Sequence, residues 1–224
     1  MYSLSEKGLY FNLYSGNNLS TTLKNGKAIK IAEQTDYPWN GDIRFTVNQA
    51  PESAFSMFFR IPGWCTDAKL TVNGKPTSIK LIPGEYAELN AQWKAGDKIE
   101  LNLAMPVTMV EANPLVEETR NQIAVKRGPV VYCIESAGIP KDAKVLDLSL
   151  SSHIDLKPEK IVIDHSNLVG LSGTASMQNT IWKNRLYQTV PAKDAGTVNI
   201  QLIPYFAWGN RGHVEMETWI PVSR

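Results

Sequence analysis

Short apolar runs, each closed by a turn signal, dominate the stretch from Met57 to Met109. In the segments LTVNG and KIELNLA, apolar and polar residues alternate with period two. This alternation is typical of strands that have one buried and one solvated face. Asn73 and Gly74, between two such runs, predict a type I′ hairpin turn, in which both central residues have positive φ. The pattern predicts a scaffold of β-sheet, and no cluster of acids, bases or metal ligands lies within it.

The same pattern continues through the first half of the chain. Apolar runs recur at a spacing of roughly 8–12 residues with Gly, Pro and Asn between them, which is typical of a β-sandwich or jelly roll. The best internal break is Glu111-Ala112-Asn113-Pro114. We therefore expect an all-β chain with two antiparallel β-sandwich (jelly-roll-like) domains in series, residues 1–113 and 114–224. The strands expected in the first half are 8–14, 19–24, 27–34, 42–48, 54–61, 68–73, 85–90, 97–103 and 106–111.

The second half is less regular. The segment 166–182 is rich in Ser, Gly, Thr and Asn, and predicts a long surface loop. Residues 154–164 allow one short helical turn within an otherwise extended segment. The strands expected in this half are 121–126, 129–135, 144–149, 160–164, 183–190, 197–203 and 214–220.

Composition excludes several functions. The 224 residues include 43% apolar residues, and the formal net charge is +1 with a pI near 7.7. A nearly neutral chain argues against nucleic-acid binding by bulk electrostatics. No apolar run reaches the roughly 18 residues that a membrane span needs. The N-terminus lacks the basic segment and apolar core of a signal peptide, and the localisation of the protein stays unknown.

The potential metal ligands and nucleophiles are few. Cys65 and Cys133 are the two cysteines, and each lies among apolar neighbours, so we expect two small buried residues rather than a disulfide or a reactive thiol. His153, His165 and His213 are too scattered for a local metal motif. The sequence therefore predicts no metal or cofactor site in this chain.

Paired carboxylates are the usual machinery of glycoside hydrolysis, and the chain has 22 acidic residues. Glu117 and Glu118 are adjacent, and on a strand they would point to opposite faces. The other close pairs are Glu85 with Glu88, and Glu215 with Glu217, and they fit the solvent-exposed face of amphipathic strands. The sequence therefore predicts no catalytic pair.

The six tryptophans are candidate surfaces for sugar binding, because sugars stack on aromatic rings. Most are expected to bury their rings and donate their indole N–H locally, as Trp93 would at the end of a strand. Trp208 is the exception, because Tyr205, Asn210 and Arg211 lie near it around a glycine-flanked turn. This group would contact either sugar hydroxyls or another domain, and docking to another domain is preferred. We expect the segment 205–219 to form that surface.

An ordered set of short motifs resembles one known family. The set comprises Gly8–Tyr14, Gln34–Trp39, RIPGWC ending at Cys65, the VNGK and W-x-x-GD motifs, LNLAMPV, Ile123–Glu135, Ile203–Gly212 and Trp219–Pro221. Together these resemble the glycoside hydrolases typified by β-L-arabinofuranosidase, over nearly the whole chain.

The resemblance implies that this chain is only part of such an enzyme. Relatives carry an N-terminal (α/α)6 barrel with the active site, followed by β-sandwich domains, and only the sandwich part is recognisable here. They use a metal site, with zinc as the expected metal, formed by a glutamate and clustered cysteines. This chain has no adjacent cysteines, so no catalytic residue can be assigned to it. Met1 need not be the native start.

The preferred hypothesis is a non-catalytic C-terminal region that supports and docks onto the catalytic barrel of the same polypeptide. We expect this region to be inactive by itself. A second copy of the chain, in a homodimer, is a further expected partner. The alternative is a stand-alone carbohydrate-binding module that binds a glycan. A third hypothesis is a complete small enzyme, and the lack of a recognisable set of catalytic residues argues against it.

Overall fold

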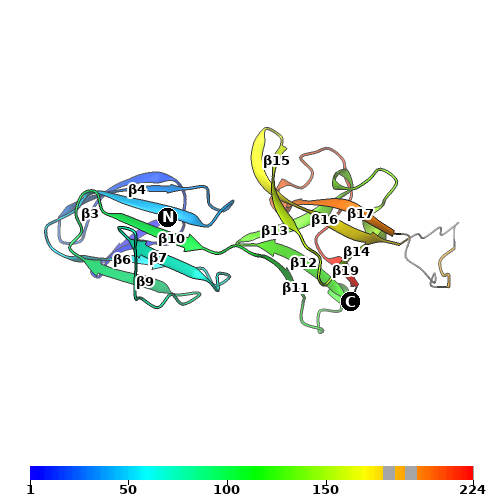
Figure 1. Cartoon of the computed structure of the whole chain (residues 1–224), viewed down its shortest axis with the longest axis horizontal. Coiled ribbons are helices and arrows are strands. Elements are labelled where there is room, and N and C mark those ends of the chain that lie inside the picture. Colours follow the sequence, from blue (N-terminus) through cyan, green and yellow to red (C-terminus); the bar gives the residue numbers. More distant parts are fainter. Residues whose placement is uncertain (179–184, 190–195, 224) are drawn as a thin grey trace. The chain divides into compact units, whose positions relative to one another are not determined.

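The computed structural model describes residues 1–178, 185–189 and 196–223 (Figure 1). The secondary structure in this part of the chain consists of β-strands and three-residue 3₁₀ turns, so the predicted all-β class is confirmed. The chain divides into two compact units, Met1–Pro106 and Val107–Arg224. No helix among the described residues is long and apolar enough to cross a membrane.

The division falls at Pro106 rather than at residue 113. The break at Glu111–Pro114 begins the connection between two paired strands of the second unit, β11 (Val107–Val110) and β12 (Gln122–Arg127). The turn residues that predicted a domain boundary therefore belong to a loop that connects two antiparallel strands of one unit.

The first unit contains two sheets. One has four strands in the order β1-β2-β6-β9, and the other has six in the order β3-β4-β5-β10-β7-β8. The four-stranded sheet consists of β1 (Tyr2–Ser5), β2 (Gly8–Phe11), β6 (Phe55–Arg60) and β9 (Tyr86–Ala91). The six-stranded sheet consists of β3 (Asn17–Thr22), β4 (Ala28–Thr35), β5 (Asp42–Gln49), β10 (Lys98–Leu103), β7 (Ala68–Val72) and β8 (Lys75–Pro76).

Three phenylalanine rings join these two sheets. Phe11 and Phe59 are stacked at 4.8 Å on the four-stranded sheet, and Phe45 of the six-stranded sheet lies 4.6 Å from Phe11 and 5.1 Å from Phe59 between ring centroids. All three side chains have 0% exposure. Each buried ring stabilises the unit by about 1.5–3 kcal/mol, and each ring pair adds about 0.5–1.5 kcal/mol. The two sheets therefore share one core, and their other faces point outward.

Glu33 is a buried carboxylate in the first unit, with 2% exposure. It accepts hydrogen bonds from the Tyr2 hydroxyl at 2.7 Å and from the Ser15 backbone N–H at 2.8 Å. The Asn17 amide donates a third at 3.3 Å. A buried carboxylate is tolerated only when its oxygens are paired in this way. Glu33 therefore ties β1 and the segment before β3 to β4.

The second unit contains a closed ring of strands. β12 pairs with both β13 and β19; β19 pairs with β14, β14 with β16, β16 with β17, and β17 with β13. All of these pairs are antiparallel except β14 with β19. Closure leaves the six strands of the ring without a free edge, whereas β11, β15 and β18 each pair with one strand of the ring. The elements not yet given are β13 (Val130–Glu135), β14 (Leu148–Ser151), β15 (Lys157–Ile163), β16 (Ser166–Met177), β17 (Gly196–Pro204), β18 (Met216–Glu217), β19 (Ile220–Ser223), and the 3₁₀ turns η1 (Glu117–Thr119), η2 (Ser136–Gly138), η3 (Val145–Asp147) and η4 (Tyr205–Ala207).

The predicted surface loop at 166–182 is wrong for its first twelve residues, which form β16 between β15 and β17. The glycines that suggested a loop have a packing reason. A Cβ added at Gly170 would lie 2.9 Å from Ile161 Cδ1, and one added at Gly173 would lie 2.8 Å from Leu156 Cδ2. Neighbouring side chains therefore cover the strand at both glycines, and a larger residue there would have to displace the ends of these side chains. Residues 179–182 lie outside the described residues.

Other expected elements differ in detail. The helical turn expected within 154–164 is wrong, because β15 occupies residues 157–163. A strand expected at 144–149 begins as η3 and becomes β14 only at Leu148. The strand expected at 183–190 is wrong over residues 185–189, which are described and do not form a strand; the other three positions lie outside the described residues. The hairpin turn is confirmed, because Asn73 has φ 50° and Gly74 has φ 75°.

Trp93→Ala should destabilise the chain by about 3–5 kcal/mol, because removal of a buried indole leaves a large cavity. The Trp93 side chain is 3% exposed, and its Nε1 donates to the Phe55 carbonyl at 3.1 Å. Trp208, which is 47% exposed, supplies the matched control, since its truncation should cost little. Urea unfolding of both variants measures the difference. Equal midpoints for the two variants would contradict the structural role of Trp93.

Candidate functional site

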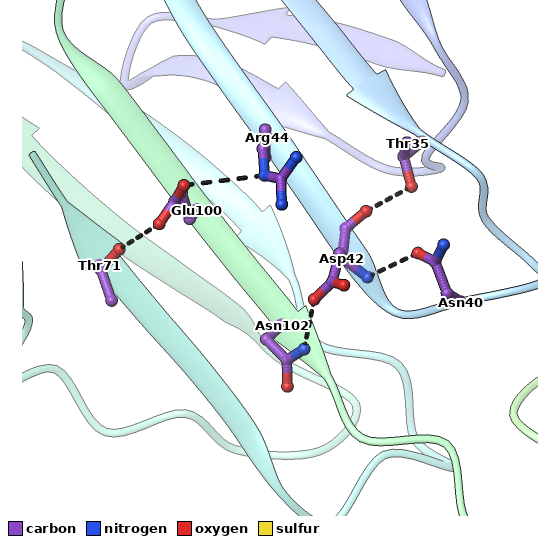
Figure 2. Close-up of polar contacts among 7 residues, drawn as sticks. All are labelled: Thr35, Asn40, Asp42, Arg44, Thr71, Glu100 and Asn102. Atoms are coloured by element: carbon purple, nitrogen blue, oxygen red, sulfur yellow. Dashed lines mark hydrogen bonds and ion pairs between the residues drawn. The ribbon is translucent and has the colours of Figure 1, made fainter. Parts of the chain in front are cut away.

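Polar side chains cross the outer face of the six-stranded sheet in two rows (Figure 2). They alternate along the strands with buried apolar side chains such as Ile43 and Leu101, so the polar set faces solvent. In register, the first row contains Gln34, Arg44, Glu100 and Thr71, and the second contains Asp42, Asn102 and Lys69. We call this set the polar face.

Asp42 is the most firmly held residue of the polar face (Figure 2). Its carbonyl oxygen accepts from Thr35 Oγ1 at 2.7 Å, and its backbone N–H donates to Asn40 Oδ1 at 3.0 Å. Across the sheet, Asn102 Nδ2 donates to Asp42 Oδ1 at 2.6 Å. These three contacts fix the backbone and one carboxylate oxygen of Asp42.

Gly41 explains why the chain can enter β5 at this point. Its carbonyl accepts from the Leu103 N–H at 2.9 Å, so the loop crosses directly over the end of β10. A Cβ at position 41 would lie 1.8 Å from the Leu103 carbonyl oxygen. Only glycine fits this close approach, and the approach sets the position of Asp42.

The first row is a loose network. Arg44 Nε lies 3.8 Å from Glu100 Oε1, and Thr71 Oγ1 donates to Glu100 Oε2 at 3.4 Å. The side chains of Arg44 and Glu100 are 65% and 50% exposed. An ion pair this exposed contributes about 0–1 kcal/mol. The row therefore adds little stability and leaves donors and acceptors able to exchange partners.

A cavity of about 240 Å³ adjoins the polar face, where β4 ends and β5 begins. Amide, hydroxyl, carboxylate and guanidinium groups line it together, so its wall carries both donors and acceptors. The lining residues are Gln34, Thr35, Asp36, Asn40, Asp42 and Arg44.

The aromatic residues that the sequence singled out in the second unit are exposed. Tyr205 and Trp208 are 48% and 47% exposed, and Phe206 between them is 64% exposed. They lie on and just after η4. Asn210 is also exposed, and its backbone N–H donates to the Ala207 carbonyl at 3.3 Å. We call Tyr205, Phe206 and Trp208 the aromatic loop.

Arg211 differs from its neighbours because its guanidinium is turned inward. Its Nε donates to Glu135 Oε2 at 2.8 Å, its Nη2 lies 2.7 Å from the same oxygen, and its Nη1 donates to Gln201 Oε1 at 3.2 Å. The Glu135 side chain is fully buried, and its other oxygen accepts from the Gly209 N–H at 2.9 Å. Arg211 thus positions the aromatic loop on the end of β13, although the sequence suggested a surface contact for it.

The cysteines are buried and free, as expected. Burial raises the pKa of the Cys133 thiol to about 12; the nearby Glu135 carboxylate adds to the shift and Arg211 opposes it. Burial also raises the pKa of the Cys65 thiol. Thiols that stay protonated at neutral pH are poor nucleophiles and poor metal ligands.

The remaining acids and histidines do not converge on a site. Glu117 and Glu118 are exposed on η1, and the three histidines are exposed. Among the described residues no group of three or more His, Cys, Asp or Glu side chains is arranged to hold a metal ion. The zinc ligands that the family resemblance implies, a glutamate with clustered cysteines, do not fit the residues that the structure describes.

A second aromatic cluster lies in the first unit, where the sequence predicted no functional surface. Tyr10 and Phe58 stack at 4.1 Å on the outer face of the four-stranded sheet, and Tyr86 meets Tyr10 edge-on at 5.3 Å. Tyr86 is 42% exposed, and its hydroxyl donates to Asn12 Oδ1 at 2.6 Å. The signal was present as polar-facing aromatic positions in GLYF and EYAEL.

Comparison with known families identifies both units as parts of a glycoside hydrolase. The model of the β-L-arabinofuranosidase GH127 middle domain matches residues 8–105. The model of the glycoside hydrolase family 127 C-terminal domain matches residues 107–221. The chain therefore belongs to glycoside hydrolase family 127, and the two matches meet where the structure divides.

Individual relatives agree with this assignment. A non-reducing end β-L-arabinofuranosidase from Bifidobacterium longum subsp. longum is 30% identical, and the match covers 90% of this chain and 32% of that protein. A solved structure described as a glycoside hydrolase has a TM-score of 0.95 at 47% identity, over all of this chain and 37% of its own. A GH127 β-L-arabinofuranosidase from Geobacillus stearothermophilus T6 has a TM-score of 0.90 at 32% identity, over 99% of this chain and 35% of its own. The chain thus spans about a third of these relatives.

Arg211→Ala should destabilise the second unit by about 3–5 kcal/mol, because it leaves the buried Glu135 carboxylate without its guanidinium. Arg120 supplies a matched control: it lies 3.8 Å from Glu117 with side chains 60% and 78% exposed, so Arg120→Ala should cost less than about 1 kcal/mol. Thermal and urea unfolding of both variants measure the costs. Equal stability of the two would show that Arg211 does not anchor the aromatic loop.

Proposed function

We propose that this chain is the non-catalytic middle and C-terminal region of a β-L-arabinofuranosidase-like glycoside hydrolase. The observation that carries the proposal is the match of its two units to the middle and C-terminal domains of family 127, over only about a third of the length of relatives named as β-L-arabinofuranosidases. In this proposal the first unit is a β-sandwich that serves as a scaffold, and the second unit is a further β-domain of the same non-catalytic region.

The chemistry of the described residues is consistent with a non-catalytic role. Hydrolysis of a glycosidic bond needs a carboxyl pair across the sugar or a substitute nucleophile. The cysteine thiols are buried and protonated, and the adjacent pair Glu117–Glu118 is exposed on a turn. The nucleophile and the zinc site of the parent enzyme then belong to a preceding catalytic barrel.

The aromatic loop is the surface that we assign to docking onto this barrel. Interface hot spots are enriched in Tyr, Trp and Arg, and exposed clusters of large apolar rings mark interaction surfaces. The loop is also held rigid, because the Glu135 carboxylate binds both Arg211 and the Gly209 N–H. A rigid surface loses little entropy on docking, which favours a permanent contact within one polypeptide.

A second group of rings in the first unit, which we call the tyrosine cluster, is less exposed than the aromatic loop: Tyr86 is 42% exposed, Tyr10 is half-buried and Phe58 is 7% exposed. Tyr10, Phe58 and Tyr86 form a ring group on the outer face of the four-stranded sheet. We assign it as a second contact with the same barrel. A carbohydrate-binding module is the alternative, with the exposed rings of the aromatic loop and Tyr86 as its sugar contacts, because aromatic faces also stack on sugars.

The purified 224-residue chain should not release nitrophenol from aryl β-L-arabinofuranosides, since the catalytic groups belong to the missing part. A colorimetric assay over a range of pH, with and without added Zn²⁺, measures this. Activity that copurifies with the chain and is abolished by one substitution within residues 1–224 would sink the proposal.

Trp208→Ala in the longer polypeptide should loosen the docked domains and lower activity several-fold, because an anchor residue at an interface contributes on the order of 2 kcal/mol or more. In the 224-residue chain the same change should leave the melting temperature nearly unchanged. Limited proteolysis between the domains and arabinofuranosidase rates measure both effects. Tyr187→Ala, at a side chain 89% exposed outside the aromatic loop, is the matched control. Equal effects of the two substitutions on proteolysis would contradict docking through the loop.

A further inference from the structure

We propose that the polar face of the first unit, from the 240 Å³ cavity at Gln34 and Arg44 across to Lys69, binds a neutral, hydroxyl-rich glycan. This goes beyond the proposed scaffold role and does not depend on it. The ligand chemistry follows from the spacing, the charge balance and the preorganisation of the polar side chains.

The spacing of the rows suits an extended chain of sugar residues. Gln34, Arg44, Glu100 and Thr71 lie on four successive strands in register. Neighbouring strands are about 4.8 Å apart, which is comparable with the length of one sugar residue in an extended glycan. Each strand therefore offers one hydrogen-bonding side chain for each sugar residue laid across the sheet.

The charges of the polar face nearly cancel. Asp42 and Glu100 are balanced by Arg44 and Lys69, and Asp36 is a further carboxylate in the lining of the cavity. A polyanion would meet two carboxylates on the rows, and a cation would meet two basic groups. A neutral ligand with many hydroxyls avoids both penalties, because each hydroxyl both donates and accepts.

The groups that would contact the glycan are partly preorganised. Asn102 holds one carboxylate oxygen of Asp42 at 2.6 Å and leaves the other without a contact in the network of Figure 2. Arg44 Nε lies 3.8 Å from Glu100 Oε1, which is beyond hydrogen-bond distance, so the planar guanidinium is available for a bidentate contact with adjacent hydroxyls. Hydrogen bonds to charged groups are stronger than those between neutral groups, so these two residues should dominate affinity.

The place of the polar face in the fold also favours a ligand there. The two sheets of the first unit share one core, so their outer faces lie on opposite sides of that unit. The four-stranded sheet carries the tyrosine cluster, which is suited to protein contact. The polar face has hydrophilic side chains and an adjoining cavity, a combination that suits a soluble ligand better than a protein interface core.

Isothermal titration of the 224-residue chain with neutral arabino-oligosaccharides and xylo-oligosaccharides tests the proposal, with polygalacturonate and Ca²⁺ as charged probes. We expect saturable binding of at least one neutral oligosaccharide. Arg44→Ala and Asn102→Ala should each weaken it about tenfold or more, with unchanged thermal unfolding. The matched control is Arg60→Ala, an exposed arginine on β6 of the opposite sheet, which should leave affinity unchanged.

Backbone amide shifts during the same titration locate the bound glycan. Shifts concentrated on β4, β5, β10 and β7 support the proposal. It is overturned if no neutral oligosaccharide binds at millimolar concentration, if only polygalacturonate or Ca²⁺ binds, or if binding is insensitive to Arg44→Ala and Asn102→Ala. Shifts on the aromatic loop instead would assign glycan binding to the second unit. These outcomes are independent of whether the longer polypeptide needs Trp208 for docking.

Discussion

The packing of Phe11, Phe59 and Phe45 is the contact on which the first unit depends. These three buried rings join the four-stranded sheet to the six-stranded sheet, so they decide which side of every strand faces the core. Because side chains alternate along a strand, fixing the inner face also fixes the outer one. The tyrosine cluster and the polar face are consequences of that choice. A register slip of one residue in β5 would bury Arg44 and expose Phe45.

Among the described residues, Glu33 in the first unit and Glu135 in the second are buried carboxylates that join segments distant in sequence. Glu33 connects β4 with β1 and with the segment before β3, and Glu135 connects β13 with the aromatic loop. A buried carboxylate is destabilising unless its oxygens are paired, so each glutamate restricts the geometry of the groups around it. The aromatic loop therefore has a defined shape although its rings are exposed, which suits a surface that docks onto a fixed partner.

The two outer faces of the first unit differ in a way that fits a division of roles. Rings gather on the four-stranded sheet, where burial against another domain would remove apolar surface from water. Hydrogen-bonding side chains gather on the six-stranded sheet, where water or a hydroxylated ligand satisfies them. An accessory region of a glycoside hydrolase that is attached on one face and binds glycan on the other would hold substrate near the enzyme.

The alternation of apolar and polar residues was enough to determine the all-β class and most strands of the first unit. The Asn73–Gly74 dipeptide determined the hairpin turn, and the place of Trp93 at the end of a strand indicated its burial. The ordered motifs identified the family. Tertiary structure alone decided the rest, because those features depend on contacts between distant residues. Asp42 and Asn102 are sixty positions apart and meet only through the pairing of β5 with β10. Arg211 was expected at the surface because its buried partner, Glu135, lies on another strand. The glycines of β16 predicted a loop because the side chains of Ile161 and Leu156 that cover them belong to other segments.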